Sequence, residues 1–219
     1  GKLIGYTSGV LGQLIPINLI NSYIFIYYVY VIGLNALLVG IATAIGALIM
    51  AFMSPFFGYI VDKKKPGKLG KRRPFLLLSL PFLFLAIIFM WISPTTESFG
   101  AYNWGIAIYL WSLLGLFFVF YAMLRSAHLS MTPEQSQVEE NRIKIGSLIG
   151  IFSILGTILG IFIPLILQSL LTNPDDIYNT PQDKQFLITF LPLFGLFVGI
   201  LTVVFTLIAF FSTDEDFLK

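Results

Sequence analysis

Charged side chains are missing from five long stretches of this 219-residue chain. These stretches are residues 3–61, 74–96, 98–124, 145–174 and 185–213. Soluble domains carry roughly 25% charged residues, whereas this chain has 11% charged and 57% hydrophobic residues. Because about 20 apolar residues suffice to cross a bilayer as a helix, the sequence predicts an all-α integral membrane protein. A soluble enzyme, a nucleic-acid-binding protein and a disordered chain are excluded.

The first stretch is long enough for two membrane-spanning helices. At about 1.5 Å per residue, a single helix through it would reach roughly 88 Å, nearly three times the hydrocarbon thickness of a bilayer. Gly33 permits a turn within this stretch, and Asn35 can cap the helix that follows. We therefore expect one six-helix transmembrane domain over residues 1–219, with spans at about 6–32, 36–61, 75–94, 102–127, 143–171 and 187–211.

Basic residues indicate which way these spans cross the membrane. Six spans put both termini on one side, and short cytoplasmic loops are enriched in Lys and Arg. With the N-terminus inside, Lys184 is the one basic residue outside. The residues then inside are Lys2, Lys63, Lys64, Lys65, Lys68, Lys71, Arg72, Arg73, Arg125, Arg142, Lys144 and Lys219. We therefore expect a multi-pass protein of the plasma (cytoplasmic) membrane, embedded in membrane lipids, with cytoplasmic N- and C-termini.

Small residues form a stripe along the second span and another along the fifth. Spacings of three and four residues place each stripe on a single helical face, and helices in membranes approach closely through such residues. Packing within the chain is one interpretation, and contact with a partner is the other. The candidate partner-contact residues are Gly40, Ala44, Ala47, Ala51, Gly146, Gly150, Ser153, Thr157 and Gly160.

Polar and aromatic side chains mark one face of the first span and one face of the fourth. Inside a membrane such groups need partners or water, so they are candidates to line a shared polar cavity. They are Gln13, Asn18, Asn21, Tyr28, Trp111, Tyr121 and Arg125. The amides can hydrogen-bond solute hydroxyls, and Trp111 can stack on a sugar face. Arg125 has a structural role, snorkelling to the interface, as its alternative.

Acidic residues are confined to loops, helix ends and the C-terminal tail. Coupling to protons or sodium usually needs an acidic group within the membrane, and the spans provide none. The single His128, at the inner end of the fourth span, is expected to be a structural residue, with a proton-coupled role as the alternative. No arrangement of nucleophile and base and no set of metal ligands is recognisable, so we expect no enzyme, no metal site and no cofactor.

The most distinctive motif is GYIVDKKKPGKLGKRRPF at residues 58–75, between the second and third spans. Glycines allow close approach and a short loop, an acidic residue can pair with the cations that follow, and a proline starts the next helix. The alternative, a solvated loop that merely follows the positive-inside rule, explains the cations but not this order. The candidate gating residues are Gly58, Asp62, Lys63, Gly70, Arg72 and Arg73.

This motif resembles the loop signature of the major facilitator superfamily. With KLIGYTSGVLG at 2–12 and TPEQ at 132–135 followed by Asn141 and Arg142, the chain resembles the N-terminal six-helix half of glycoside/pentoside/hexuronide:cation symporters, the branch of the melibiose and sucrose carriers. The resemblance implies two inverted three-helix repeats. It further implies that the first and fourth helices line the cavity, the second and fifth contact the other half, and the third and sixth lie outside.

The chain departs from that branch at the positions that bind the coupling cation and the sugar. Acidic residues of the family's second helix align with Met50 and Ser54, and the acidic sugar-binding residue of its first helix aligns near Gln13 or Leu14. The resemblance therefore does not carry sodium coupling or galactoside recognition to these positions.

Two functions follow as expectations. The first is a half-size transporter that ends at Lys219, where the carrier's middle loop would begin, and pairs with a second half, either another copy or a separate chain. The assembled carrier, a homodimer in the first case, would move a small polar solute such as a sugar or glycoside by alternating access. The alternative is a non-transporting assembly or receptor module derived from a transporter half. Neither function involves nucleic acid.

Overall fold

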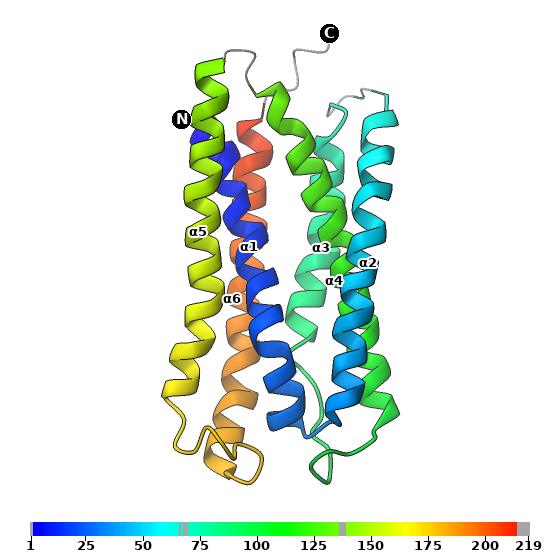
Figure 1. The fold of residues 1–219 in the computed structure, drawn as a ribbon, viewed down its shortest axis with the longest axis vertical. Coiled ribbons are helices and arrows are strands. Elements are labelled where there is room, and N and C mark those ends of the chain that lie inside the picture. The colour runs from blue at the N-terminus through cyan, green and yellow to red at the C-terminus, as the bar shows by residue number, and fades with distance from the viewer. Residues whose placement is uncertain (1, 66, 68–69, 136–138, 214–219) are drawn as a thin grey trace.

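The computed structural model describes residues 2–65, 67, 70–135 and 139–213. These residues form a bundle of six long α-helices without a β-strand (Figure 1). A π-helix, Tyr27–Ile32, extends the first helix, and a single 3₁₀ turn, Thr132–Glu134, follows the fourth. The helices are α1 Lys2–Ile26, α2 Ala36–Lys63, α3 Arg73–Phe89, α4 Trp104–Met131, α5 Glu139–Ser169 and α6 Pro181–Ser212.

Five of these helical segments are long and apolar enough to span a membrane, which makes this a multi-pass membrane protein. The exception is α3, which has 17 residues and ends at Phe89 rather than near the predicted residue 94. The chain leaves the helix through tight turns up to Ile92, and Pro94 disfavours helical backbone at the residue before it. The predicted third span, and with it the count of six spans, therefore stays a prediction.

The predicted turn between the first two helices is confirmed. Gly33 adopts a left-handed backbone with φ of 89°, which a residue with a Cβ rarely tolerates. Asn35 then caps α2, because its side-chain oxygen accepts a hydrogen bond of 2.9 Å from the backbone N–H of Leu37. Asn103 caps α4 in the same way, accepting a 3.1 Å bond from Ile106.

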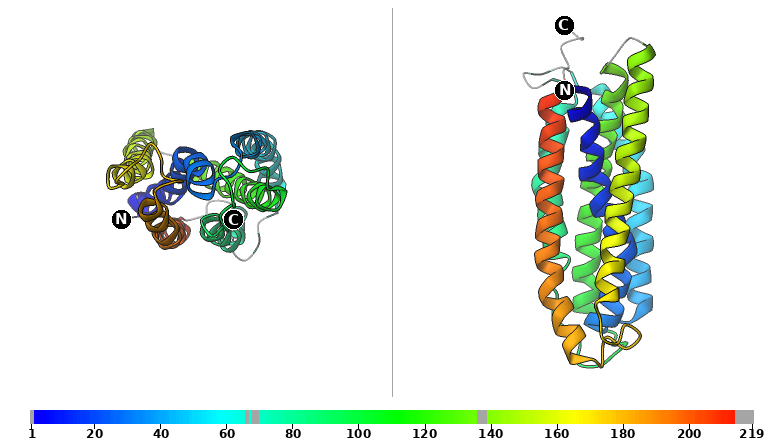
Figure 2. Two further views of the ribbon diagram at one scale, coloured as in Figure 1. Left: turned by 90° about the horizontal axis from the view of Figure 1, so that it is seen from below. Right: turned by 90° about the vertical axis from the view of Figure 1, so that its left-hand side faces the viewer.

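Helix packing divides the bundle into two groups (Figures 1 and 2). In one, α1 packs on α5 and α6, and in the other, α4 packs on α2 and α3. The two groups meet mainly where α3 packs on α6, while α1 hardly touches α2 or α4. Exchanging α1–α3 with α4–α6 leaves this set of packed pairs unchanged. The two halves of the chain therefore use their helices in equivalent ways.

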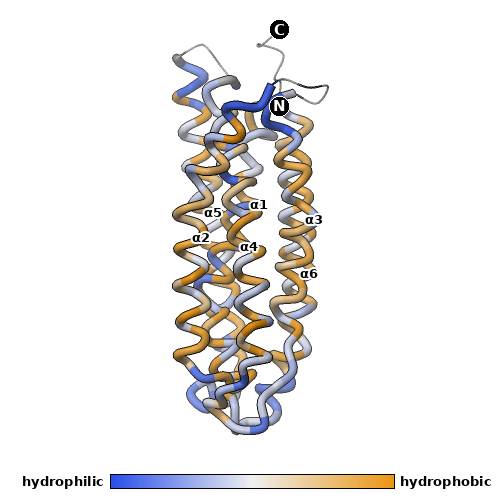
Figure 3. The backbone as a smooth tube through the Cα atoms, turned by 90° about the vertical axis from the view of Figure 1, so that its right-hand side faces the viewer, coloured by the Kyte–Doolittle hydropathy of each residue, from blue (hydrophilic) through white to orange (hydrophobic). Residues whose placement is uncertain are grey.

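Polar residues gather at the two ends of the bundle, and apolar residues cover its length (Figure 3). The start of α1, the ends of α2, α4 and α6, and the starts of α3 and α5 lie at one end (Figure 1). Nearly all described basic residues belong to this end, which we call the basic end. Lys184 is in the first turns of α6 at the opposite end. Lys68 and Lys219 lie outside the described residues.

Candidate functional site

A cavity of about 470 Å³ lies between α1, α2 and α4. It exists because α1 packs on α5 and α6 instead of closing onto α2 and α4. Its wall is mostly apolar, its polar members are an amide and two hydroxyls, and it contains no charged side chain. The lining residues are Ile17, Ile20, Asn21, Ile24, Thr43, Ala47, Met50, Ala51, Ser54, Leu114 and Phe118. Such a wall suits an uncharged solute that offers hydroxyl groups and an apolar face.

The wall formed by α2 is set by hydrogen bonds and by one close helix contact. The hydroxyls of Thr43 and Ser54 donate to backbone carbonyls of α2 itself, at 2.9 and 2.8 Å. Each hydroxyl can still accept a hydrogen bond from a solute. A Cβ on Gly46 would overlap the ring of Phe118, so this glycine lets α2 and α4 meet at the cavity wall.

The four residues predicted from the first span take different positions. Asn21 lines the cavity, whereas Asn18 turns toward α5 and donates to the carbonyl of Leu14 and, at 3.4 Å, to the hydroxyl of Thr157. Gln13 is 1% exposed, with no partner for its side-chain nitrogen among the described residues. It is not part of the cavity lining, so only one of these amides borders the cavity.

Tyr28 lies outside the cavity lining and joins the π-helix after α1 to the turns that follow α3. Its hydroxyl donates to the carbonyl of Met90 at 2.9 Å, and the neighbouring Tyr27 donates to Trp91 at 2.7 Å. The prediction that Tyr28 shares a face with Asn21 assumed a regular helix with about 3.6 residues per turn. The π-helix that begins at Tyr27 has a wider turn and shifts the side chains out of that register.

The predicted residues of α4 are not among the residues that line the cavity. The indole nitrogen of Trp111 donates to the carbonyl of Leu38 at 3.0 Å, which holds α4 against the start of α2. Tyr121 is buried and stacks on Phe117, and Arg125 lies beside Tyr121. The lining residues of this helix are instead Leu114 and Phe118, which share a helical face with Trp111 by their spacing of three and seven residues.

Several cavity residues were assigned to another role or to none by sequence reasoning. Ala47 and Ala51 were expected to contact a partner, yet they line the cavity while remaining exposed. The aliphatic positions of α1 carried no polar signal that could single them out. Met50 and Ser54 could have been found from the resemblance, which aligns them with acidic positions of the family's second helix.

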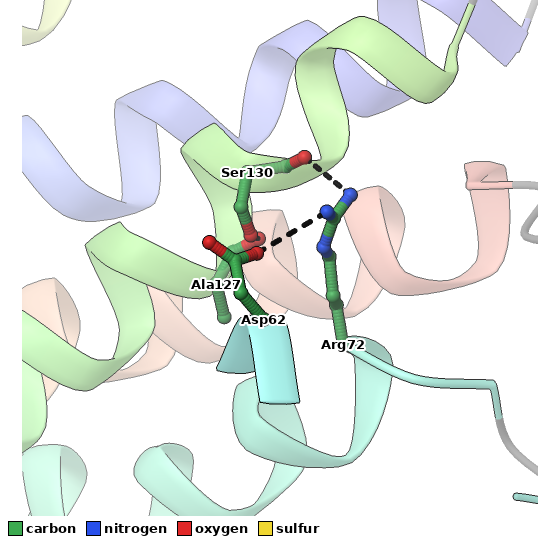
Figure 4. Close-up of polar contacts among 4 residues, drawn as sticks. All are labelled: Asp62, Arg72, Ala127 and Ser130. Carbon is green, nitrogen blue, oxygen red and sulfur yellow. Dashed lines mark hydrogen bonds and ion pairs between the residues drawn. The ribbon is translucent and has the colours of Figure 1, made fainter. Parts of the chain in front are cut away.

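The candidate gating residues form a linked cluster at the basic end. The carboxylate of Asp62 lies 3.4 Å from the guanidinium of Arg72, which also donates to the backbone carbonyl of Ser130 at the end of α4 (Figure 4). Arg73 donates to the carbonyl of Phe210 in α6 at 2.8 Å and covers its ring. Two adjacent arginines therefore tie the start of α3 to both groups of helices.

The remaining gating candidates shape the loop and its edges. The backbones of Gly67 and Gly70 exchange hydrogen bonds of 3.2 and 3.0 Å, and Gly70 has φ of 87°. The ammonium of Lys63 covers the ring of Tyr59 at 4.4 Å. Gly58 faces open space, since a Cβ there would meet nothing within 4 Å.

The candidate partner-contact stripe of α5 is divided along its length. Gly146 and Gly150 near the basic end are exposed and open, while Ser153 and Thr157 are half-buried. Gly160 is buried, because a Cβ there would lie 2.6 Å from the Cβ of Asn18. This last residue therefore serves packing on α1. On α2, Gly40 is open and Ala44 is exposed.

Within the described part of the chain, no group of three or more His, Asp or Glu side chains could hold a metal ion. The buried His128 stacks on Tyr6 with ring centroids 4.6 Å apart, and the Tyr6 hydroxyl donates to its carbonyl at 2.7 Å. This geometry gives the imidazole a packing role between α4 and α1.

Comparison with known proteins agrees with this architecture. The family described as MFS/sugar transport protein matches residues 5–217. An uncharacterized symporter of Synechocystis sp., sll1374, is 26% identical over 167 residues, covering 76% of this chain and 30% of its own length. The uncharacterized symporter YnaJ of Bacillus subtilis is 28% identical over 166 residues, covering 74% of this chain and 34% of its own. This chain thus spans about a third of the length of these relatives, and it belongs to the sugar-transport family of the major facilitator superfamily, whose members are transporters and not enzymes.

Proposed function

We propose that this chain is a six-helix half of a major-facilitator carrier, and that it pairs with a second half to move a small polar solute by alternating access. The single observation that carries this proposal is the uncharged cavity bounded by α1, α2 and α4. A sugar or glycoside fits the wall best, because its hydroxyls match Asn21, Thr43 and Ser54 and its ring faces are apolar.

The packed pairs support two inverted three-helix repeats, α1–α3 and α4–α6. In this arrangement α3 is the third span despite its length. It begins at the basic end, whereas α4 begins at the opposite end (Figure 1), so α3 and the residues that follow it must cross the bundle between them. With the chain in the plasma membrane, the basic end then faces the cytoplasm by the positive-inside rule.

The exposed faces of α2 and α5 support the second half as a partner. In the most apolar 18-residue segment of each helix, only 22% of the α2 residues and 17% of the α5 residues are buried, against 67% for α1 with its π-helix extension. The relatives are about three times as long as the matched region, which leaves room for a second half in each of them.

The contacts of Arg72 and Arg73 support alternating access by a rigid half. The Arg72 and Arg73 contacts join the two helix groups at the basic end, so they hold this half as one body that can rock against its partner. The cavity wall carries Met50 and Ser54 and no carboxylate, and we therefore assign no cation site to it.

Uptake by proteoliposomes tests this function. The chain is reconstituted alone and with the remainder of its carrier, and uptake of radiolabelled neutral sugars and glycosides is measured. We expect uptake that falls at least about ten-fold in Ser54→Leu, which fills the cavity, and that persists in Ser169→Leu, an exposed serine of α5 remote from it. No uptake in either preparation would favour the non-transporting module instead.

A further inference from the structure

A second pocket, of about 730 Å³, lies at the basic end between the first turns of α1 and α5. It shares no residue with the central cavity. Two lysines and a hydroxyl provide its polar groups, and aliphatic side chains form the rest of its wall. The lining residues are Lys2, Leu3, Ile4, Ile143, Lys144, Ser147 and Leu148. These helices lie side by side along their length (Figures 1 and 2), so the pocket is a seam between two packed helices.

The chemistry of this pocket changes along the helix axis. Its lysines come from residues close to the helix starts, where the chain enters the aqueous phase. Ile4 and Ile143 are 55% and 64% exposed beside them, and Leu148 continues the apolar wall toward the bilayer centre. Cations above an exposed aliphatic surface match the boundary between phospholipid headgroups and acyl chains.

Among the described side chains, the carboxylate of Glu140 lies beside the pocket residue Lys144. The ammonium of Lys144 lies 2.7 Å from Glu140, and both side chains are more than half exposed. Such exposed pairs contribute little and exchange readily with solvent. The ammonium has three N–H donors, so it can contact Glu140 and a phosphate oxygen together.

We propose that this pocket binds an anionic phospholipid, with the phosphate between Lys2 and Lys144 and an acyl chain along Leu3, Ile143 and Leu148. Complementary charge favours an anionic headgroup over a zwitterionic one. The aliphatic wall favours a lipid over a free anion, which would leave that wall unused. This inference rests on the membrane location of the chain and is independent of the transported solute.

Native mass spectrometry of the purified chain in mild detergent tests the proposal. The probes are phosphatidylglycerol and phosphatidylcholine with identical acyl chains, and inorganic phosphate. We expect phosphatidylglycerol to bind in preference to phosphatidylcholine, and Lys144→Gln and Lys2→Gln each to weaken its binding about five-fold. Leu148→Gln should weaken lipid binding while leaving both lysines in place. Lys184→Gln removes one cation at the opposite end and is the matched control.

Three results would overturn the proposal. Equal binding of the two lipids would show that charge does not select the occupant. If Lys184→Gln weakened phosphatidylglycerol binding as much as Lys144→Gln, the lipid would be attracted to the positive charge of the whole chain and not to this pocket. Displacement of the lipid by inorganic phosphate at similar concentration would make the site one for a free anion. None of these measurements uses transport, so a failure of the proposed transport function would leave them unaffected.

Discussion

Glycines lie in two contrasting environments in this bundle. Along the seams of α6 they touch a neighbouring helix: a Cβ on Gly199 would lie 3.1 Å from the ring of Phe84, and the Cβ of Ala209 would be 2.6 Å from one on Gly9 of α1. At four other glycines, two on α2 and two on α5, a Cβ would meet nothing within 4 Å. These open glycines are Gly40, Gly58, Gly146 and Gly150.

The contrast separates packing that this chain completes from packing that it leaves open. In the seams, small residues allow backbones to approach, which is their usual use in membranes. On the open faces the same residues give up side-chain contact area without gaining any within the chain. A second half that approaches these faces would supply the missing contacts, as we propose. Three glycine substitutions examine this contrast and a fourth substitution, at Asp62, examines the gating cluster, from the largest expected effect to the smallest.

Gly195→Leu should prevent stable folding. A Cβ at this position would overlap the ring of Trp91 and lie 3.3 Å from the carbonyl oxygen of Ile87, so a leucine would force α3 and α6 apart at a cost of at least about 1–3 kcal/mol. Size-exclusion chromatography in detergent should show loss of the monodisperse peak. Val204→Leu, on an exposed part of the same helix, should elute normally. A normal peak for Gly195→Leu would mean that this seam is not tightly packed.

Gly150→Leu should leave folding intact and weaken association. The leucine has free space within the chain, but it would keep a partner from approaching α5, which we expect to weaken association about ten-fold. Mass photometry in mild detergent measures the oligomer population. Thr189→Leu adds similar bulk to an exposed position of α6 and should have no effect. Equal populations in both variants would remove the open face of α5 from the interface.

Asp62→Asn should slow uptake without affecting insertion. The Asp62 side chain at the end of α2 is 62% exposed, and exposed ion pairs contribute at most about 1 kcal/mol. We therefore expect the initial uptake rate to fall by about five-fold at most. Initial uptake rates and the amount of protein in the membrane are measured together. Glu140→Gln, which breaks another exposed pair, is the control. Unchanged uptake in Asp62→Asn would refute the gating role.

Gly40→Ala should stabilise the chain slightly. The methyl group meets no neighbour, and replacing glycine in a helix interior gains roughly 0.5–1 kcal/mol, or about 1–3 °C in Tm. Gly9→Ala, which brings its methyl group against Ala209 and His128, should lower Tm instead. If both variants shift Tm in the same direction, the contrast between seam and open glycines does not hold.

Much of the fold could be predicted from the sequence because membrane insertion imposes simple rules. Uncharged runs located the helices, and Gly33 and Asn35 marked a turn that the structure contains. The shortened α3 escaped this reasoning, because its apolar sequence continues beyond the point where tight turns end the helix.

The candidate site was harder to predict for two physical reasons. The π-helix at Tyr27 changed the side-chain register, which places Tyr28 against the turns that follow α3 and outside the cavity lining. Aliphatic residues such as Ile17 and Ile20 line the cavity, yet they resemble any other apolar residue of a membrane helix. A polar stripe in the sequence indicates which side of a helix faces a cavity. It does not show which of its polar side chains hydrogen-bond to neighbouring helices or loops instead.

Cysteine crosslinking in native membranes tests most directly the claim that α2 and α5 face a second half. The chain contains no cysteine, so each introduced thiol reports on one position. Each cysteine variant is expressed as two copies of the chain, or together with the remainder of the carrier carrying matching cysteines. The account predicts that Ala47→Cys and Gly150→Cys form a crosslinked species, whereas Val204→Cys on α6 does not. Crosslinking through Val204→Cys alone, or none at either of the other two positions, would contradict it.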